Sequence, residues 1–164
     1  MPNEPITYVR QIKNLLDRLC EAVADLDERQ LNLRPPVAGA NSAYAIAAHI
    51  LGNAEAWILG IACGLPIERD RPGEFAAAGA GAAPLIARAN ELALRFEKAL
   101  SALPSGAFDE VRQPSQTLWG EGSPHPVTVR EAILHAIEHA ALHLGQLDVT
   151  RDFVLTGVGS EPHQ

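Results

Sequence analysis

The sequence has few aromatic residues, few cysteines and no long hydrophobic run. Only 5% of its 164 residues are Phe, Trp or Tyr, although 47% are hydrophobic and alanine is abundant. This balance favours closely packed helices over sheets. The two cysteines, Cys20 and Cys63, form no Cys-x-x-Cys pair, so we expect two buried, reduced thiols rather than a disulfide or a cysteine-rich zinc site.

Clusters of basic residues are also missing. The formal net charge is -7, and a chain without a Lys/Arg patch to neutralise phosphates is a poor candidate for nucleic-acid binding. No apolar run approaches the roughly 20 residues that cross a bilayer, and the first residues, MPNEPITYVR, lack the charged-then-apolar pattern of an export signal. We therefore expect a cytoplasmic protein that binds neither membranes nor nucleic acids.

The sequence does contain four stretches in which hydrophobic residues recur at spacings of three and four, which predicts amphipathic helices. They span residues 5–28, 41–63, 84–103 and 128–153, with Asn41 or Ser42 as the cap of the second. Four helices with one apolar stripe each predict an all-α four-helix bundle, formed as a single domain by residues 1–164. Residues 155–164 are expected to form a frayed tail.

Two long connections separate these helices. Residues 64–83 are rich in glycine and show no helical pattern, and they are long enough to run back along a bundle, so that helices two and three point the same way. The second connection, residues 104–126, contains Trp119. A tryptophan in such a loop either covers the mouth of a pocket or fills the end of the core.

The last predicted helix carries three histidines at intervals of four residues, His135, His139 and His143. Residues four apart lie on the same side of a helix about 6 Å apart, so two imidazoles at this spacing can bind one metal ion. His139 and His143 lie at the edge of the apolar face and are the favoured pair. His135 lies further round, towards solvent or a position behind the ligands.

A third ligand is expected from the second helix, where His49 lies at the edge of the core face and Asn53 follows one turn later. Three neutral imidazoles leave an open coordination position, as catalysis requires. We expect zinc, with nickel and iron as alternatives. Gln146 falls close to His139 on the helical wheel and is a candidate partner of the ligands, whereas His125 and His163 are expected at the surface.

These residues resemble a known family. The stretch HAALHLGQL, together with AYAIAAHILGNAEAWI around His49, is similar to the DinB-like (YfiT-like) superfamily of metal-binding four-helix bundles, and the similarity extends over residues 5–155. The resemblance implies that His49, His139 and His143 bind one divalent ion. It also implies an up-down-down-up helix order, for which the long 64–83 crossover is suitable, and a homodimer.

The resemblance further implies chemistry with thiols. The family includes transferases that join bacillithiol, mycothiol or glutathione to electrophiles, and a mycothiol-dependent maleylpyruvate isomerase. The isomerase pattern, in which a glutamate replaces one histidine, is not matched here. The chain also offers no basic cluster for an acidic thiol, since Arg112, Arg130 and Arg151 are isolated.

Three hypotheses follow. The first is a metal-dependent thiol transferase or related detoxifying enzyme, in which a small-molecule thiol or water is activated. The second is a non-catalytic metal-binding protein of the stress response, which predicts that removing the metal unfolds the bundle. The third is a plain dimerising bundle with incidental histidines, which predicts that no metal binds.

Overall fold

The computed structural model describes residues 4–157, and long helices account for most of them. The expectation of an all-α protein is confirmed. The long helices are α1 (Glu4–Val23), α3 (Ala43–Ala54) continued by the π-helix η1 (Glu55–Ala62), α5 (Ala83–Ser101) and α7 (Val129–Thr156).

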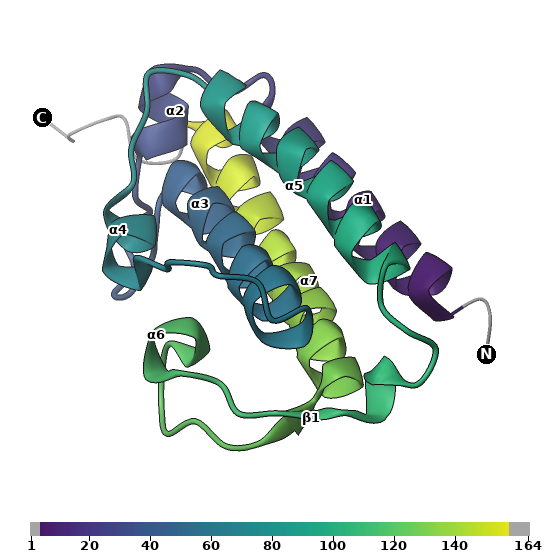
Figure 1. The fold of residues 1–164 in the computed structure, drawn as a ribbon. Helices are drawn as coiled ribbons and strands as arrows, with labels where there is room; N and C mark the ends of the chain where they lie inside the picture. The colour runs from purple at the N-terminus through teal and green to yellow at the C-terminus, as the bar shows by residue number, and fades with distance from the viewer. Residues whose placement is uncertain (1–3, 158–164) are drawn as a thin grey trace, which may run out of the picture.

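The four long helices pack side by side along most of their length (Figure 1). Helix α3 packs against α7, while α1 packs against α5 and α7, and α3 also contacts α5. Helices α3 and α5 both begin at the end of the molecule where α1 and α7 finish (Figure 1). The segment that joins η1 to α5 therefore runs back along the outside of the molecule (Figure 1).

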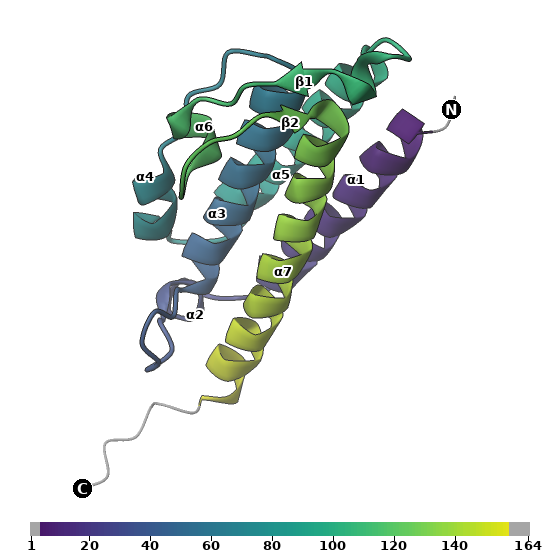
Figure 2. The same cartoon turned by 90° about the horizontal axis from the view of Figure 1, so that it is seen from below.

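The helix formed by α3 and η1 lies at the centre of the packing. Every residue of α3 is buried, and so is every residue of η1 except Glu55. The prediction of a single apolar stripe on this helix was therefore wrong, because α4 and α6 cover the side that would otherwise face solvent (Figures 1 and 2). Residues Ala43–Ala62 are long and apolar enough to cross a membrane, so the expectation that no apolar run approaches that length was wrong, although 94% of the tested window is buried inside the protein.

The first helix is shorter than its hydrophobic pattern predicted. It ends at Val23, and Asp27 then begins a separate helix, α2 (Glu28–Asn32), through a capping box with Gln30. Leu26 is nevertheless buried. The spacing of hydrophobic residues therefore continues through the turn after Val23. For this reason the spacing alone could not show where the first helix ends.

Both long connections contain short elements that were not predicted. The crossover forms α4 (Arg71–Ala76), started by Asp70, whose side chain accepts a hydrogen bond from the backbone N–H of Gly73. The second connection contains the 3₁₀-helix η2 (Ala107–Asp109), strand β1 (Val111–Arg112), helix α6 (Gln116–Trp119) and strand β2 (Val127–Thr128).

Strands β1 and β2 form a short antiparallel pair that fixes where α7 begins. Val111 lies opposite Thr128, and Arg112 lies opposite Val127 (Figure 2). The predicted capping box of Thr128 and Glu131 is present at the start of α7. The helix continues to Thr156 and ends at Gly157, which has a φ of 66°, so the expected fraying from residue 155 was wrong for residues 155 and 156. The rest of that tail, with His163, lies outside the described residues.

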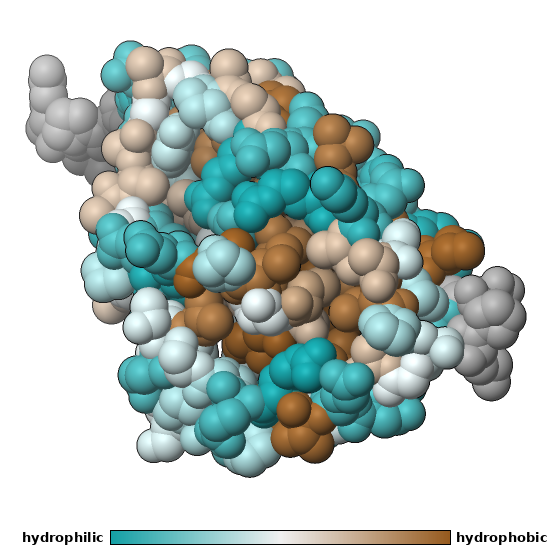
Figure 3. Space-filling view, viewed as in Figure 1, coloured by the Kyte–Doolittle hydropathy of each residue, from teal (hydrophilic) through white to brown (hydrophobic). Residues whose placement is uncertain are grey.

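One face of the molecule carries hydrophobic side chains at its centre, around the end of η1, with hydrophilic ones around them (Figure 3). A hollow of about 500 Å³ lies between η1 and α5 and is lined mainly by Leu59, Cys63, Leu65 and Leu103. Its lining contains neither a histidine nor a carboxylate. The cluster of histidines lies elsewhere, between α3 and α7.

Candidate metal centre

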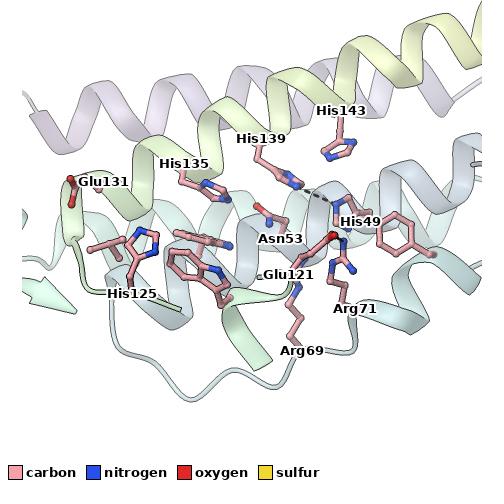
Figure 4. A pocket seen from close by; sticks show the side chains of 14 residues that line it. His49, Asn53, Arg69, Arg71, Glu121, His125, Glu131, His135, His139 and His143 are labelled. Atoms are coloured by element: carbon pink, nitrogen blue, oxygen red, sulfur yellow. Dashed lines mark hydrogen bonds and ion pairs between the residues drawn. The ribbon is translucent and has the colours of Figure 1, made fainter. Parts of the chain in front are cut away.

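The structure brings His49, His139 and His143 together in the space between α3 and α7 (Figure 4). Their candidate ligand nitrogens all lie within 4.8 Å of one another, and Nε2 of His49 is 3.2 Å from Nε2 of His139. His49 is only 3% exposed, while the other two are half-buried. Three residues from two helices thus form a group that could hold a metal ion.

Local sequence explains why these side chains meet. Ser42 caps α3 by accepting a hydrogen bond from the backbone N–H of Ala45, and Thr128 caps α7, so each helix has a defined start. From these starts His49 faces α7, and the spacing of four places His139 and His143 one above the other facing α3.

His49 is supported from behind by a buried carboxylate that the sequence analysis missed. Nδ1 of His49 donates to Oε2 of Glu74 at 2.7 Å, and Glu74 is 7% exposed. Because Nδ1 carries the proton, the lone pair of His49 lies on Nε2, which faces His139. Glu74 is on α4, in the crossover that was predicted to contain no helix.

Arg69 holds this carboxylate in place. Its Nε donates to Oε1 of Glu74 at 2.9 Å and its Nη2 to Oε2 at 3.1 Å, a two-pronged contact made by a side chain that is only 2% exposed. Its Nη1 also donates to the backbone carbonyl of Leu118, on α6, at 3.2 Å. Gly52 provides the space for the carboxylate, since a Cβ there would lie 2.1 Å from Oε1 of Glu74.

The two histidines on α7 have weaker support. Nδ1 of His143 lies 2.7 Å from Oε1 of the exposed Gln146 and donates to it, which again leaves Nε2 free for an ion. Gln146 was predicted to lie near His139, but it bonds His143, because a residue three positions on reaches back along the helix more easily than one seven positions away. Nδ1 of His139 is buried without a hydrogen-bond partner among the described residues.

The electrostatics keep the α7 imidazoles neutral. Burial, followed by the neighbouring histidines and Arg69, lowers the pKa of His139 to about 2. Burial also lowers the pKa of His143. For Glu74, burial acts to raise the pKa, but the hydrogen bonds from His49 and Arg69 outweigh it, so the pKa is lowered and the carboxylate is ionised.

These observations are compatible with a bound metal ion. Two nitrogens bound to one tetrahedral zinc ion lie about 3.3 Å apart, given zinc–nitrogen bonds of about 2.0 Å, and the observed Nε2–Nε2 distance is 3.2 Å. Unprotonated imidazoles are the form that binds metals, and the proton of His49 is directed away from the centre by a carboxylate. The donor set therefore suits a divalent ion with an open coordination position.

A cavity of about 640 Å³ opens beside the three histidines. Asn53, His135 and Trp119, the other predicted pocket residues, all line it (Figure 4). His135 was expected to lie towards solvent or behind the ligands, and the structure shows a half-buried ring that stacks on Trp57 with centroids 3.6 Å apart. His125 is exposed as expected, but it also lies on the cavity wall, 4.4 Å from Trp119.

The cavity also has arginines that the sequence analysis did not select. Arg69 and Arg71 line it, and Arg71 lies 5.1 Å from the ring of Phe75 and donates to Glu121 at 2.8 Å. The three arginines that were considered are bonded elsewhere and do not line the cavity: Arg112 bonds Glu110, Arg130 bonds Glu4 and Asp109, and Arg151 bonds Asp25. A signal for the missed residues was present in ERDRPGEF, where an Asp followed by Pro and Gly marks the start of a helix.

Comparison with known families agrees with this architecture. The family model of the DinB superfamily matches residues 11–147. The chain belongs to the DinB superfamily. No curated protein matches the chain.

Two solved structures share the DinB fold of this chain. A DinB-like protein from Bacillus cereus ATCC 10987 superposes with a TM-score of 0.61 at 17% identity, covering 96% of this chain and 90% of the other. A conserved protein from Enterococcus faecalis superposes with a TM-score of 0.66 at 19% identity, covering 93% of this chain and 98% of the other. At such identities the likeness concerns the fold alone.

Proposed function

We propose that this DinB-superfamily chain is a metal-dependent enzyme that transfers a small-molecule thiol onto an electrophile, or uses water in place of the thiol. The observation that carries the proposal is the His49–His139–His143 group, which is partly buried yet opens on a cavity large enough for a small substrate. A divalent ion bound there supplies Lewis acidity and an open position at which a thiol or water loses its proton near neutral pH.

The lining of the cavity indicates that the nucleophile comes from solution. Among the described residues that line it there is no cysteine, serine, tyrosine or lysine. In a transfer of this kind the sulfur electron pair forms the new S–C bond and the thiol proton leaves to solvent. The electrophile either accepts the electron pair or expels its leaving group.

The chain's own residues orient the reactants and exclude water. Glu74 and Gln146 fix the ring orientations of His49 and His143 through bonds of 2.7 Å each. Trp119 covers the cavity opposite Trp57, with ring centroids 5.0 Å apart. Arg71 places a positive charge on the cavity wall, where it favours an anionic nucleophile.

The first test is the metal content of the purified, tag-free chain by mass spectrometry after reconstitution with zinc or nickel. We expect one ion per chain, and loss of that ion in His49→Ala and in His139→Ala. His125→Ala is the matched control, because its imidazole lies on the same cavity wall but outside the group, and it should keep the ion. A wild-type chain that takes up no ion would overturn the proposal.

The second test measures loss of free thiol in the presence of an electrophile by the zinc-loaded protein and by His139→Ala. We expect faster consumption only with the loaded wild type. Equal rates in both would leave a non-catalytic metal-binding protein of the stress response. That alternative is consistent with the lack of cysteine, serine, tyrosine and lysine in the described cavity lining, and it predicts that a chelator lowers the melting temperature.

The proposal also covers the order of the helices, the oligomeric state and the cellular location. The directions of the four long helices support a four-helix bundle of up-down-down-up order. Exposed Leu134, Leu142 and Val149 on the outer side of α7 offer a surface for a homodimer. The two free cysteines, which are half-buried rather than fully buried as expected, suit a cytoplasmic location.

A further inference from the structure

The end of the cavity away from the three histidines is built from rings. Trp57 of η1 lies 3.6 Å from the ring of His135 and 5.0 Å from that of Trp119, which in turn lies 4.4 Å from His125. Asn53 lies one turn before Trp57 and one turn after His49, so it separates this group from the metal centre (Figure 4). We call Asn53, Trp57, Trp119, His125 and His135 the ring box.

Two polar atoms of the ring box have no hydrogen-bond partner within residues 4–157. They are Oδ1 of Asn53, an acceptor, and Nε1 of Trp57, a donor. Asn53 is 4% exposed and Trp57 is 3% exposed, and both residues line the cavity. An unpaired polar group in a buried position costs about 1–3 kcal/mol and needs a reason. A ligand that pairs with both atoms would supply one.

The charged groups near the ring box are bonded to other parts of the protein. Arg69 is committed to Glu74 and to the carbonyl of Leu118. Glu131 accepts hydrogen bonds from Thr128 at the cap of α7. An uncharged ligand is therefore favoured over an ionised one at this end of the cavity.

From these contacts we infer that the ring box is a recognition site for an uncharged, planar group bearing a carboxamide-like pair of donor and acceptor, such as an aromatic amide. Its carbonyl accepts from Nε1 of Trp57 and its N–H donates to Oδ1 of Asn53, while its flat ring stacks on the indole of Trp119. That this group belongs to the electrophile rests on the proposed function, whereas binding itself does not.

Access to the box depends on the cover formed by α6. This helix has four residues, and Leu118 is tied to the body of the protein by the Arg69 hydrogen bond of 3.2 Å. Oδ1 of Asn53 and Nε1 of Trp57 are both buried, and the indole of Trp119 lies 5.0 Å from that of Trp57, so a ligand cannot reach the two atoms while the cover is in place. Binding therefore requires α6 to move outwards, and the change should be visible at Trp119.

Tryptophan fluorescence tests this directly, because Trp57 and Trp119 are the only two tryptophans of the chain. The metal-loaded protein is titrated with benzamide, with cyclohexanecarboxamide, which has the same amide on a non-planar ring, and with benzoate, which has the same ring with a charge. Calorimetry gives the same affinities independently. We expect benzamide to bind at least about tenfold more tightly than either of the others.

A matched pair of variants separates the hydrogen bond from the ring. Trp57→Phe removes the unpaired N–H and should weaken benzamide binding about tenfold, as should Asn53→Ala. Trp119→Phe keeps a flat ring at the cover and should change the affinity less than about threefold. Circular dichroism and metal content show that each variant is folded and loaded.

The outcomes distinguish this inference from the proposed function. No spectral or calorimetric response to benzamide, equal binding of cyclohexanecarboxamide, or equal losses in Trp57→Phe and Trp119→Phe would each overturn the ring box as a recognition site while leaving metal binding intact. A chain that binds benzamide as expected but takes up no metal would overturn the proposed function and leave the ring box standing.

Discussion

The two sides of the candidate metal centre are supported very differently. On the α3 side, His49 is buried and bonded to a buried carboxylate, which is itself held by a buried arginine. On the α7 side, His139 has no partner for Nδ1 among the described residues and His143 has only an exposed amide. The ring of His49 is therefore held in one orientation before any ion binds, whereas the rings of His139 and His143 are held less firmly.

This difference shows that the crossover between η1 and α5, and not only the four long helices, positions a side chain of the candidate centre. His49 obtains its orientation from α4 and the residues before it, which lie outside the four long helices. Carboxylate partners of metal-binding histidines fix the tautomer and raise the basicity of the ring. The predictions below remove the support on one side at a time, in order of decreasing effect.

The largest effect is expected from removal of the buried carboxylate. Glu74→Ala leaves the guanidinium of Arg69 buried without a countercharge, which costs about 3–5 kcal/mol of unfolding free energy. Chemical denaturation of the metal-free protein at neutral pH measures this cost. Glu74→Gln is the control, because it keeps the size and part of the bonding and should lose clearly less.

The pH dependence of that loss provides a second check. The pKa of Glu74 is lowered from 4.5, so the stabilisation by its charge is complete above about pH 4.5 and is lost as the pH falls through the lowered value in the folded state. The difference in unfolding free energy between the wild type and Glu74→Gln should therefore shrink in acid. A difference that stays constant from neutral pH down to strong acid would contradict an ionised Glu74.

The candidate ligands on both sides of the centre could be predicted from the sequence. His139 and His143 share one helix, and their relative position follows from a spacing of four. His49 has a recognisable place on an apolar face, so the three candidate ligands could be selected together. Each of these inferences depends on helical periodicity, a local property, and the structure brings the selected residues together.

The support for His49 could not be predicted in that way. Glu74 is 25 residues from His49, in a segment with no periodicity, and Arg69 approaches it through a turn rather than along a helix face. The change from α3 to the π-helix η1 at Glu55 has no signature in the hydrophobic pattern either. Contacts that depend on the path of a connection require the three-dimensional structure, although Asp70 and Pro72 did signal that a helix begins there.

An intermediate effect is expected at the glycine that makes room for the carboxylate. In Gly52→Ala the new Cβ would lie 2.1 Å from Oε1 of Glu74, so the carboxylate has to move although both His49 and Arg69 hold it. We expect a loss of about 1–3 kcal/mol in unfolding free energy. We also expect zinc affinity to fall about tenfold by competition with a chelating dye, since the orientation of His49 depends on that carboxylate.

Gly145 on α7 provides the matched control for this change. It is also inside a long helix, but a Cβ there meets no atom within 4 Å. Gly145→Ala should stabilise the protein by about 0.5–1 kcal/mol through the helix propensity of alanine, with unchanged zinc affinity. Similar losses of unfolding free energy and zinc affinity from both substitutions would show that Gly52 matters only as a helix residue and not because it makes room for Glu74.

The smallest effect is expected from removing the support on the α7 side. Gln146→Ala deletes the one hydrogen bond to Nδ1 of His143, but the position is exposed and water can replace the amide oxygen. We expect zinc affinity to fall less than about threefold, against about 10–100-fold in Glu74→Gln, where a neutral amide replaces the carboxylate bonded to Nδ1 of the buried His49. Both variants are titrated with the same chelating dye. If Gln146→Ala lost as much affinity as Glu74→Gln, the two sides would be equally supported, and the fixed orientation of His49 could not be what distinguishes the α3 side.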